Sequence, residues 1–135
     1  ILRAGLGMVE GLLTLIPSAR VGHIGMYRDE ETCEPVFYYY KMPANKERLV
    51  IVTDPMLATG ISADLSYRAL LTKGKPAKTV FACVIASQQA VDYVISHFPE
   101  DTILYCAAID PILNEHAYIV PGLGDAGDLC FGEKL

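Results

Sequence analysis

Apolar runs and amphipathic segments alternate along most of the chain. Three apolar runs rich in β-branched residues, at residues 49–52, 78–86 and 102–107, have the character of buried strands. The segments between them, residues 61–73 and 88–97, are typical of helices and end near glycine or proline. This alternation predicts an α/β fold in which helices cover both faces of a parallel sheet.

The N-terminal part adds a helix and a hairpin to this pattern. Residues 1–5 have the character of a strand end that turns into a helix over residues 7–15. Two β-prone stretches, residues 20–26 and 36–40, lie on either side of a charged turn. The second stretch contains three consecutive tyrosines, which favour a strand. We therefore expect a projecting β-hairpin before the central strand.

Length and composition indicate a single folded domain. The chain has 135 residues, of which 52% are hydrophobic and 20% are charged, so it can bury a core and is not disordered. It lacks an initiating methionine and starts within a strand-like pattern. We therefore expect one domain over residues 1–135 whose N-terminal part is missing.

Charge, hydropathy and cysteine usage argue against several function classes. The net charge is −5 and the lysines and arginines do not cluster, which argues against a nucleic-acid partner. No apolar run approaches the roughly 20 residues that a membrane span needs, so no membrane partner is expected. The 4 cysteines show no metal-ligand spacing, which fits reduced thiols and a cytoplasmic location.

The most informative stretch is residues 49–62, LVIVTDPMLATGIS. A buried strand that leads through a glycine-containing turn into a helix builds an anion site, because unpaired backbone N–H groups and the helix dipole point at the same place. Thr59 and Ser62 add hydroxyl donors, and Asp54 follows the strand. The lysine and the spacing of a P-loop are missing. An ordinary strand-to-helix turn is the alternative interpretation.

Further polar residues should gather at the same edge of the sheet, because ligands of α/β sheets bind beyond the carboxyl ends of the strands. Arg3 follows the first strand, Arg28 begins the hairpin turn, and residues 122–128 follow the last strand. Two arginines and an anion-binding turn suit a ligand with phosphate at both ends. Asp54 would then bind hydroxyl groups of the ligand, or Mg²⁺ through water.

Each of these residues also has a purely structural interpretation. Arg3 can cap a turn, and Arg28 can pair with Asp29 or Glu30 on a solvated face. Asp125 can brace its loop by accepting hydrogen bonds from backbone N–H groups, as aspartate often does in turns. Both kinds of interpretation stay open on the residues alone.

Several segments together resemble the uracil phosphoribosyltransferase family, namely ILRAGLGM, GMYRDEET, DPMLATG, LNEHAYIVPGLGDAGD and the terminal FG. The resemblance covers essentially the whole chain, and the combination of DPMLATG with GLGDAGD is specific. It implies a phosphoribosyltransferase-type parallel sheet flanked by helices. It also implies pyrimidine salvage, in which ribose 5-phosphate passes from 5-phosphoribosyl diphosphate (PRPP) to N1 of uracil. The products would be UMP and diphosphate, and the cofactor would be Mg²⁺.

The resemblance implies a set of site residues as well. Arg3 and Arg28 would contact the diphosphate. The rest of PRPP would lie on the loop formed by Asp54, Pro55, Met56, Leu57, Ala58, Thr59, Gly60, Ile61 and Ser62. Uracil would be surrounded by Ile119, Gly124, Asp125 and Ala126, with Asp125 also reaching PRPP. Arg28 and Asp125 are the candidate catalytic residues. No metal ligand is directly assigned, because Mg²⁺ would arrive with PRPP.

Two departures from the family pattern bear on activity. The pattern Thr-Gly-Gly-Ser is replaced by Thr59-Gly60-Ile61-Ser62. If position 61 needs a positive φ, isoleucine would weaken phosphate binding by about 1–3 kcal/mol. If position 61 is the first helical residue, the cost is small. The Ser-Gln-Gln sequence at residues 87–89 also differs from the family's Pro/Glu/Gly-containing turn.

Three functions therefore stay open. The first is the enzyme, which we favour. The second is a pyrimidine-nucleotide-binding regulator that turns over slowly. The third is a catalytically lapsed domain, such as the C-terminal part of a uridine kinase fusion. The tyrosines at residues 38–40 suit a dimer arm, so a homo-oligomer is expected, and GTP is a candidate activator. The sequence contains no convincing general base.

Overall fold

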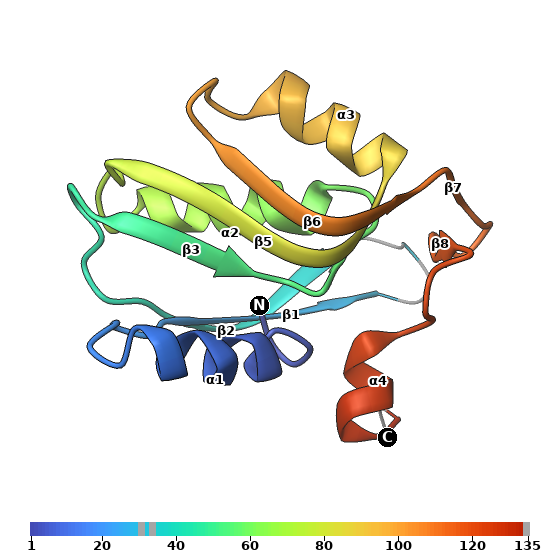
Figure 1. Ribbon diagram of the computed structural model, residues 1–135, viewed down its shortest axis with the longest axis horizontal. Coiled ribbons are helices and arrows are strands. Elements are labelled where there is room, and N and C mark those ends of the chain that lie inside the picture. The colour runs from blue at the N-terminus through green and yellow to red at the C-terminus, as the bar shows by residue number, and fades with distance from the viewer. Residues whose placement is uncertain (30–31, 33–34, 134–135) are drawn as a thin grey trace.

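The computed structural model describes residues 1–29, 32 and 35–133, which form an α/β fold (Figure 1). In chain order the elements are α1 (Leu6–Leu15), β1 (His23–Arg28), β2 (Pro35–Lys41), β3 (Leu49–Thr53), β4 (Met56–Leu57), α2 (Ile61–Leu71), β5 (Lys78–Ser87), α3 (Gln88–His97), β6 (Ile103–Asp110), β7 (Ile112–Leu113), β8 (Ile119–Val120) and α4 (Ala126–Phe131).

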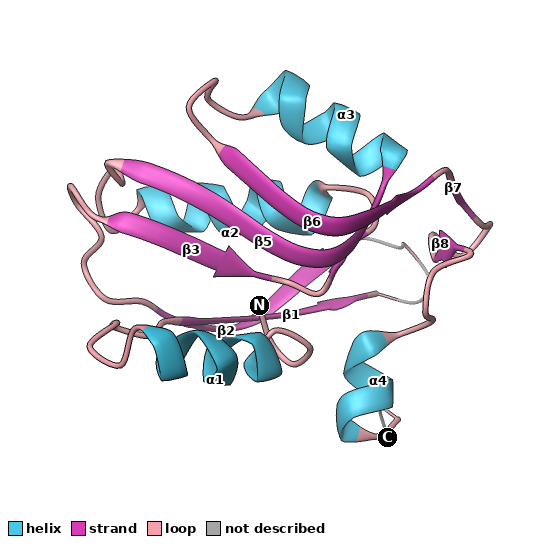
Figure 2. Cartoon of the chain, in the orientation of Figure 1, coloured by secondary structure: helices cyan, strands magenta, loops and turns pink. Residues whose placement is uncertain are grey.

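The parallel sheet is built around β5. The strand β3 pairs with one edge of β5 and β6 pairs with the other edge (Figure 2). The short strand β4 follows β3 on the same edge of β5. Between β3 and β4 the regular pairing is interrupted at Pro55, whose carbonyl oxygen accepts hydrogen bonds from the backbone N–H groups of Val84 and Ile85 at 3.0 Å each. The predicted fold class, a parallel sheet flanked by helices, is confirmed.

The main hydrophobic core lies where α2 and α3 pack on one face of this sheet. Leu70 of α2 is 1% exposed, and the ring of Phe98, directly after α3, meets Phe81 of β5 edge-on with the ring centroids 5.1 Å apart. The remaining buried members of this core are Val52, Leu57, Ala63, Cys83, Ala86, Ala90 and Val94. Burial raises the pKa of the Cys83 thiol to about 12, so this thiol stays protonated at neutral pH.

The opposite face of the sheet is covered only in part by the described residues. The helix α1 packs beside β3, where Thr53 Oγ1 donates to the carbonyl oxygen of Gly5 at 3.4 Å. Farther across the sheet, Val84 is 41% exposed, Tyr105 is 64% exposed and Ile109 is 49% exposed. The register of β5 and β6 places these three side chains on one face. Helices were predicted to cover both faces of the sheet. Among the described residues, the face opposite α2 and α3 is covered by a helix only at β3, where α1 packs.

The projecting hairpin is present. The strands β1 and β2 pair antiparallel, with an irregularity between Gly25 and Met26. Its last tyrosine, Tyr40, is anchored because its hydroxyl donates to the carbonyl oxygen of Ala69 on α2 at 2.7 Å. Tyr38 is 54% exposed and so remains available at the surface. Residues 30 and 31 of the predicted charged turn lie outside the described residues.

The last part of the chain contains elements that the sequence pattern does not predict. The strands β7 and β8 pair antiparallel, with Ile112 opposite Val120. The turn between them is closed by Asn114, whose Oδ1 accepts from the backbone N–H groups of His116 and Tyr118 at 3.0 and 2.9 Å. The short helix α4 follows. Elements of this length show no periodicity, so the sequence indicates only a loop here.

The division between core and surface on α2 gives a stability prediction. Leu70→Ala should lower the free energy of unfolding by about 2–5 kcal/mol, because it leaves a cavity in the core between α2 and the sheet. The neighbouring Leu71 is 41% exposed and provides a matched control. Leu71→Ala should cost less than about 1 kcal/mol. Urea unfolding at a common m value measures both effects, and equal losses in the two variants would contradict this placement of the core.

Candidate active site

The turn between β4 and α2 has a backbone suited to binding an anion. Gly60 occupies the N-cap position of α2 with φ at 84°, in the left-handed region. A Cβ atom at Gly60 would lie 2.8 Å from the ring of Tyr93, so both conformation and space require glycine there. Ile61 is the first residue of α2. Of the two expectations for Ile61, the helical one therefore holds, and the special backbone belongs to Gly60.

Ser87 holds the inner side of this turn. Its Oγ donates to the carbonyl oxygen of Ala58 at 2.5 Å. Ser87 Oγ also accepts a hydrogen bond from the backbone N–H of Ala90 at 3.0 Å and so caps the N-terminus of α3. The sequence at residues 87–89 thus departs from the family pattern while keeping the turn attached to the end of β5.

Asp54 lies at the carboxyl end of β3, as predicted. One of its carboxylate oxygens accepts from the backbone N–H of Met56 at 3.4 Å. Burial raises the pKa of the Asp54 carboxyl group to about 6.

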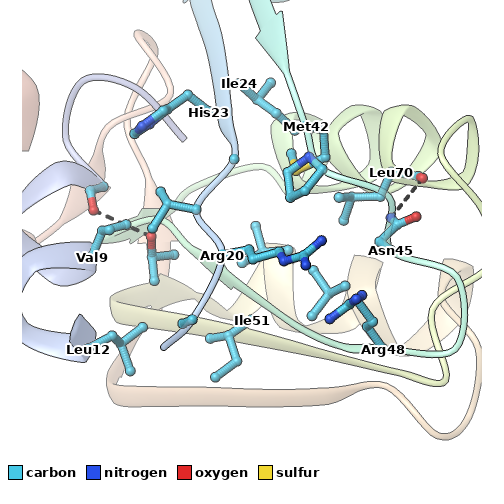
Figure 3. Close-up of a pocket in the computed structure, with 18 of the residues that line it drawn as sticks. Val9, Leu12, Arg20, His23, Ile24, Met42, Asn45, Arg48, Ile51 and Leu70 are labelled. Atoms are coloured by element: carbon cyan, nitrogen blue, oxygen red, sulfur yellow. Dashed lines mark hydrogen bonds between the residues drawn. The ribbon is translucent and has the colours of Figure 1, made fainter. Parts of the chain in front are cut away.

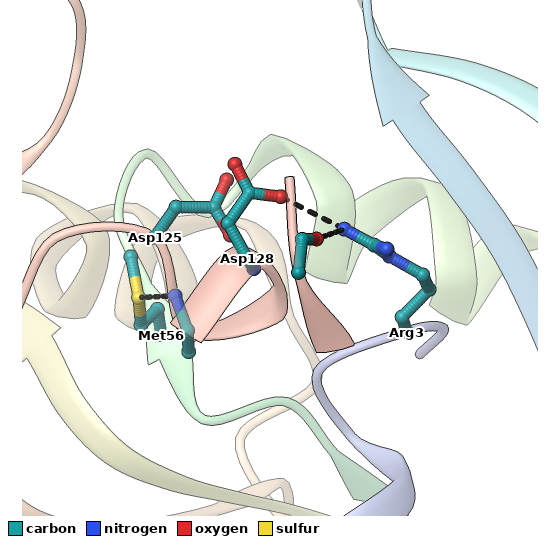
Figure 4. Close-up of polar contacts among 6 residues, drawn as sticks. Arg3, Met56, Asp125 and Asp128 are labelled. Carbon is teal, nitrogen blue, oxygen red and sulfur yellow. Dashed lines mark hydrogen bonds and ion pairs between the residues drawn. The ribbon is translucent and has the colours of Figure 1, made fainter. Parts of the chain in front are cut away.

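Arg3 reaches from the turn before α1 to the C-terminal helix (Figure 4). Its Nη2 donates to Asp128 Oδ1 at 2.8 Å and to the carbonyl oxygen of Gly132 at 3.1 Å. The turn can lie against β3 because position 5 is glycine: a Cβ atom at Gly5 would lie 2.6 Å from the carbonyl oxygen of Thr53. The guanidinium group therefore forms a long-range ion pair and does not cap its own turn.

One of the residues predicted to surround uracil, Ala126, contacts the loop at residues 54–62. Ile119 lies buried on β8, while Asp125 and Ala126 begin α4. The backbone N–H of Ala126 meets the sulfur atom of Met56 at 3.2 Å (Figure 4). This contact joins the loop at residues 54–62 to the loop at residues 124–126.

Two aspartates stabilise the loop at residues 124–126 and the turn before it. Asp110, the last residue of β6, accepts from the backbone N–H of Gly122 at 2.9 Å. Asp125 Oδ1 accepts from the backbone N–H of Asp128 at 3.0 Å and caps α4. The bracing role that was one of the two interpretations of Asp125 is therefore present in the structure, and it leaves the ligand-binding interpretation untested.

Arg3 and Asp125 line one cavity of about 350 Å³. The other residues of its wall are Leu2, Ala4, Met26, Tyr27, Tyr38 and Gly127. The cavity thus brings together Arg3, in the turn before α1, and Asp125, the N-cap residue of α4. The side chain of Arg28, the other predicted arginine, lies outside the described residues. Thr59 and Gly60 do not line the cavity, and Met56 forms the connection to their turn.

A larger cavity lies elsewhere, between α1 and the strands β1 and β3 (Figure 3). It has a volume of about 450 Å³, a largely apolar wall that includes Leu12 and Ile51, and Arg20 and Arg48 among its polar side chains. Asn45 lines it too; its Nδ2 donates to the carbonyl oxygen of Leu70 at 2.9 Å, and its Oδ1 has no hydrogen-bond partner among the described residues. None of the predicted site residues lines this cavity.

Neither a metal-ligand cluster nor a membrane-spanning helix is present among the described residues. Within the described ranges there is no group of three or more His, Cys, Asp or Glu side chains that could hold a metal ion. Over the same ranges, no helix has the length and hydropathy that crossing a membrane would need.

Sequence reasoning missed Asp128 and the hairpin wall of the smaller cavity. The spacing of Asp125 and Asp128 is that of an N-cap followed by an acidic residue in the first helical turn, so it could have indicated the start of α4. Nothing local indicates that Asp128 pairs with Arg3, because 125 positions separate them in the chain. Tyr27 and Tyr38 have no sequence signal for a place beside Arg3 either.

The sequence resembles curated proteins over nearly its full extent. A sequence model of uracil phosphoribosyltransferase matches residues 1–133. The uracil phosphoribosyltransferase of Bacillus licheniformis is 57% identical over 136 residues, which cover 99% of this chain and 64% of that protein. The enzyme of Alkaliphilus metalliredigens is 55% identical, with the same two coverages. The chain thus spans about 64% of the length of the curated relatives that it matches.

Solved structures of other proteins have a fold similar to that of this chain. The AQ2163 protein from Aquifex aeolicus matches with a TM-score of 0.91 at 37% identity, over 97% of this chain and 62% of that one. A purine phosphoribosyltransferase from Pyrococcus horikoshii matches with a TM-score of 0.59 at 14% identity, over 84% of this chain and 77% of that one, and so shows a likeness of fold alone. From the matched residues and the identities to its relatives, the chain belongs to the uracil phosphoribosyltransferase family.

Proposed function

We propose that the protein transfers ribose 5-phosphate from PRPP to N1 of uracil and releases UMP and diphosphate, as an enzyme of pyrimidine salvage. The observation that carries the proposal is the contact between Met56 and Ala126, which joins the anion-binding turn to the loop expected to hold the base. Membership of the family, with relatives at 54–57% identity, supports the same reaction.

PRPP would lie along the carboxyl edge of the sheet. Its 5-phosphate would bind the turn that Gly60 shapes, where the N-terminus of α2 supplies backbone N–H groups and Thr59 and Ser62 supply hydroxyl donors. The ribose hydroxyls would lie near Asp54. The diphosphate would then reach Arg3, whose guanidinium group lines the smaller cavity, and Arg28.

Uracil would be bound mainly through the backbone of the loop that contains Ile119, Gly124 and Ala126. The N–H of Ala126 now meets a thioether sulfur, which is a weak acceptor. A uracil carbonyl oxygen is a stronger acceptor and could replace the Met56 sulfur without disturbing α4. Cytosine presents an amino donor where uracil presents a carbonyl, so it would leave a buried group unpaired.

Bond cleavage at the anomeric carbon would develop oxocarbenium character as diphosphate leaves. Arg3 and Arg28 would stabilise the negative charge on the leaving group, and positioning of the two substrates would supply much of the rate. The carboxylate of Asp125, on the wall of the same cavity, would favour the positive charge that develops on the ribose. Arg28 and Asp125 are accordingly the proposed catalytic residues.

Mg²⁺ is the proposed cofactor, brought to the site by the diphosphate. Asp54 and Asp125 are the described carboxylates of the proposed site that could face it, Asp54 through water. When bound, the ion would neutralise part of the charge on the leaving diphosphate.

A homo-oligomer and a cytoplasmic location complete the proposal. Tyr38 and Tyr39 of the hairpin are 54% and 44% exposed, and exposed aromatic side chains of this kind suit a dimer arm. No partner among nucleic acids or membranes is proposed. Activation by GTP rests on the family resemblance alone.

Turnover distinguishes the enzyme from its two alternatives. The full-length natural protein, incubated with PRPP, uracil and Mg²⁺, should form UMP and diphosphate, which chromatography measures. Cytosine in place of uracil should give a rate lower by about 10²-fold or more. Tight binding of UMP without turnover would favour the pyrimidine-nucleotide-binding regulator. Absence of both turnover and UMP binding would favour the lapsed domain, including one fused to a uridine kinase.

Asp125→Asn separates the catalytic role of this residue from its structural one. Asparagine is also a good N-cap, so α4 should keep its start and the free energy of unfolding should change by less than about 1 kcal/mol. Removal of the charge should lower kcat by about 10²-fold or more. Steady-state kinetics and thermal unfolding measure the two effects. A near-normal kcat with a raised KM for uracil would leave Asp125 as a binding residue outside the chemistry.

Gly60 and Ile61 form a second matched pair. Gly60→Ala should weaken PRPP binding by about tenfold, because alanine resists the left-handed backbone and its Cβ atom would press on Tyr93. Ile61→Ala should leave the affinity within about twofold, because position 61 is an ordinary helical position. Calorimetric titration with PRPP compares the variants. Equal affinities for both variants would show that the turn does not bind the phosphate.

A further inference from the structure

The ion pair between Arg3 and Asp128 connects the first turn of the chain to its last helix. Arg3 Nη2 donates to Asp128 Oδ1 at 2.8 Å, and the same nitrogen donates to the carbonyl oxygen of Gly132 at 3.1 Å. Asp128 belongs to α4, and Gly132 is the C-cap residue of the same helix. Both acceptors therefore come from one short helix, which holds the end of the arginine side chain.

The ion pair uses only part of the guanidinium group. No hydrogen bond joins Nε or Nη1 of Arg3 to any residue within the described ranges. Arg3 lines the cavity of about 350 Å³, whereas Asp128 is not part of its wall. The aspartate therefore contacts Arg3 without itself lining the cavity. This arrangement leaves donors of the planar guanidinium group for an anion in the cavity.

The position of Asp128 is itself fixed by the helix. Its backbone N–H donates to Asp125 Oδ1 at 3.0 Å, and its carbonyl oxygen accepts from the backbone N–H of Gly132 at 2.9 Å. The turn that caps α4 through Asp125 therefore also sets the place of the Asp128 carboxylate (Figure 4). Arg3 is held in a fixed relation to Asp125, with which it shares the cavity.

We propose that Asp128 is a positioning residue, which orients the Arg3 guanidinium group toward the diphosphate of PRPP. The proposal rests on the proposed function and adds a residue to it. A free arginine side chain loses much rotational freedom when it binds a ligand. A side chain already held in its binding orientation loses less, so the ligand binds more tightly. Asp128 would do this without touching the substrate.

The opposite role would be competition, in which Asp128 occupies Arg3 and must release it before the diphosphate binds. The two roles predict opposite signs. If Asp128 orients Arg3, removal of its charge weakens binding of the diphosphate. If Asp128 competes, the same change strengthens binding. The position of Asp128 outside the cavity wall favours orientation.

The test measures binding of three molecules to the full-length natural protein and to Asp128→Asn. The molecules are PRPP, inorganic diphosphate and UMP, titrated calorimetrically in one Mg²⁺-containing buffer. Affinity for PRPP and for diphosphate should fall by about tenfold in the variant, as expected when a charged partner is removed from an arginine that binds the ligand. Affinity for UMP, which has no diphosphate, should stay within about twofold.

Two further variants sharpen the result. Asp92→Asn removes another hydrogen-bonded carboxylate, on the exposed side of α3, and should change none of the three affinities. In an Arg3→Lys background, Asp128→Asn should have a much smaller effect on diphosphate binding, because lysine has no planar guanidinium group to orient. Thermal unfolding of each variant shows whether the fold is intact.

The alternative outcomes are distinct. Equal losses for UMP and diphosphate would mean that Asp128 merely supports α4, and the proposal would be wrong. Unchanged or tighter diphosphate binding, or the same loss in the Arg3→Lys background, would overturn it as well. If the unmodified protein binds neither PRPP nor UMP, the proposed function itself fails.

Discussion

The parallel pairing of β5 with its neighbours is the constraint on which the rest of the structure depends. Because β3, β4 and β6 all run in the direction of β5, their carboxyl ends meet at one edge of the sheet. The interruption at Pro55 keeps β4 on the same edge of β5 and carries Met56 beyond the end of β3. Loops that follow different strands can therefore form one site.

The contacts that cross the candidate site differ in strength from those that build its frame. The frame consists of backbone ladders and of helix caps such as those made by Ser87 and Asp125. Across the site, by contrast, a sulfur atom accepts from the N–H of Ala126, and the ion pair of Arg3 is about one-third exposed on both sides. Water competes with such contacts, and a charged or polar ligand can replace them at small cost.

The longest elements could be predicted from the sequence, because their apolar positions repeat often enough to define a period. The helix at residues 88–97 agrees with its prediction at both ends, and β3 agrees to within one residue. The strands β4, β7 and β8 and the helix α4 are too short for such a signal. For Ile61, residue identity left two backbone conformations open. In the structure the left-handed backbone belongs to Gly60, and Ile61 is the first residue of the helix. The partner of Arg3 depends on tertiary packing, which leaves no trace in local spacing.

The open strip at Val84, Tyr105 and Ile109 has a practical consequence for anyone who handles these 135 residues by themselves. Within the described residues, β3 shares a strand ladder with β5 alone, so its second edge is not paired with another strand and lies near an exposed apolar surface. Surfaces of this kind drive self-association, and strand edges direct it toward ordered aggregates. Light scattering and solubility screens of the isolated polypeptide would therefore report on colloidal behaviour as much as on folding.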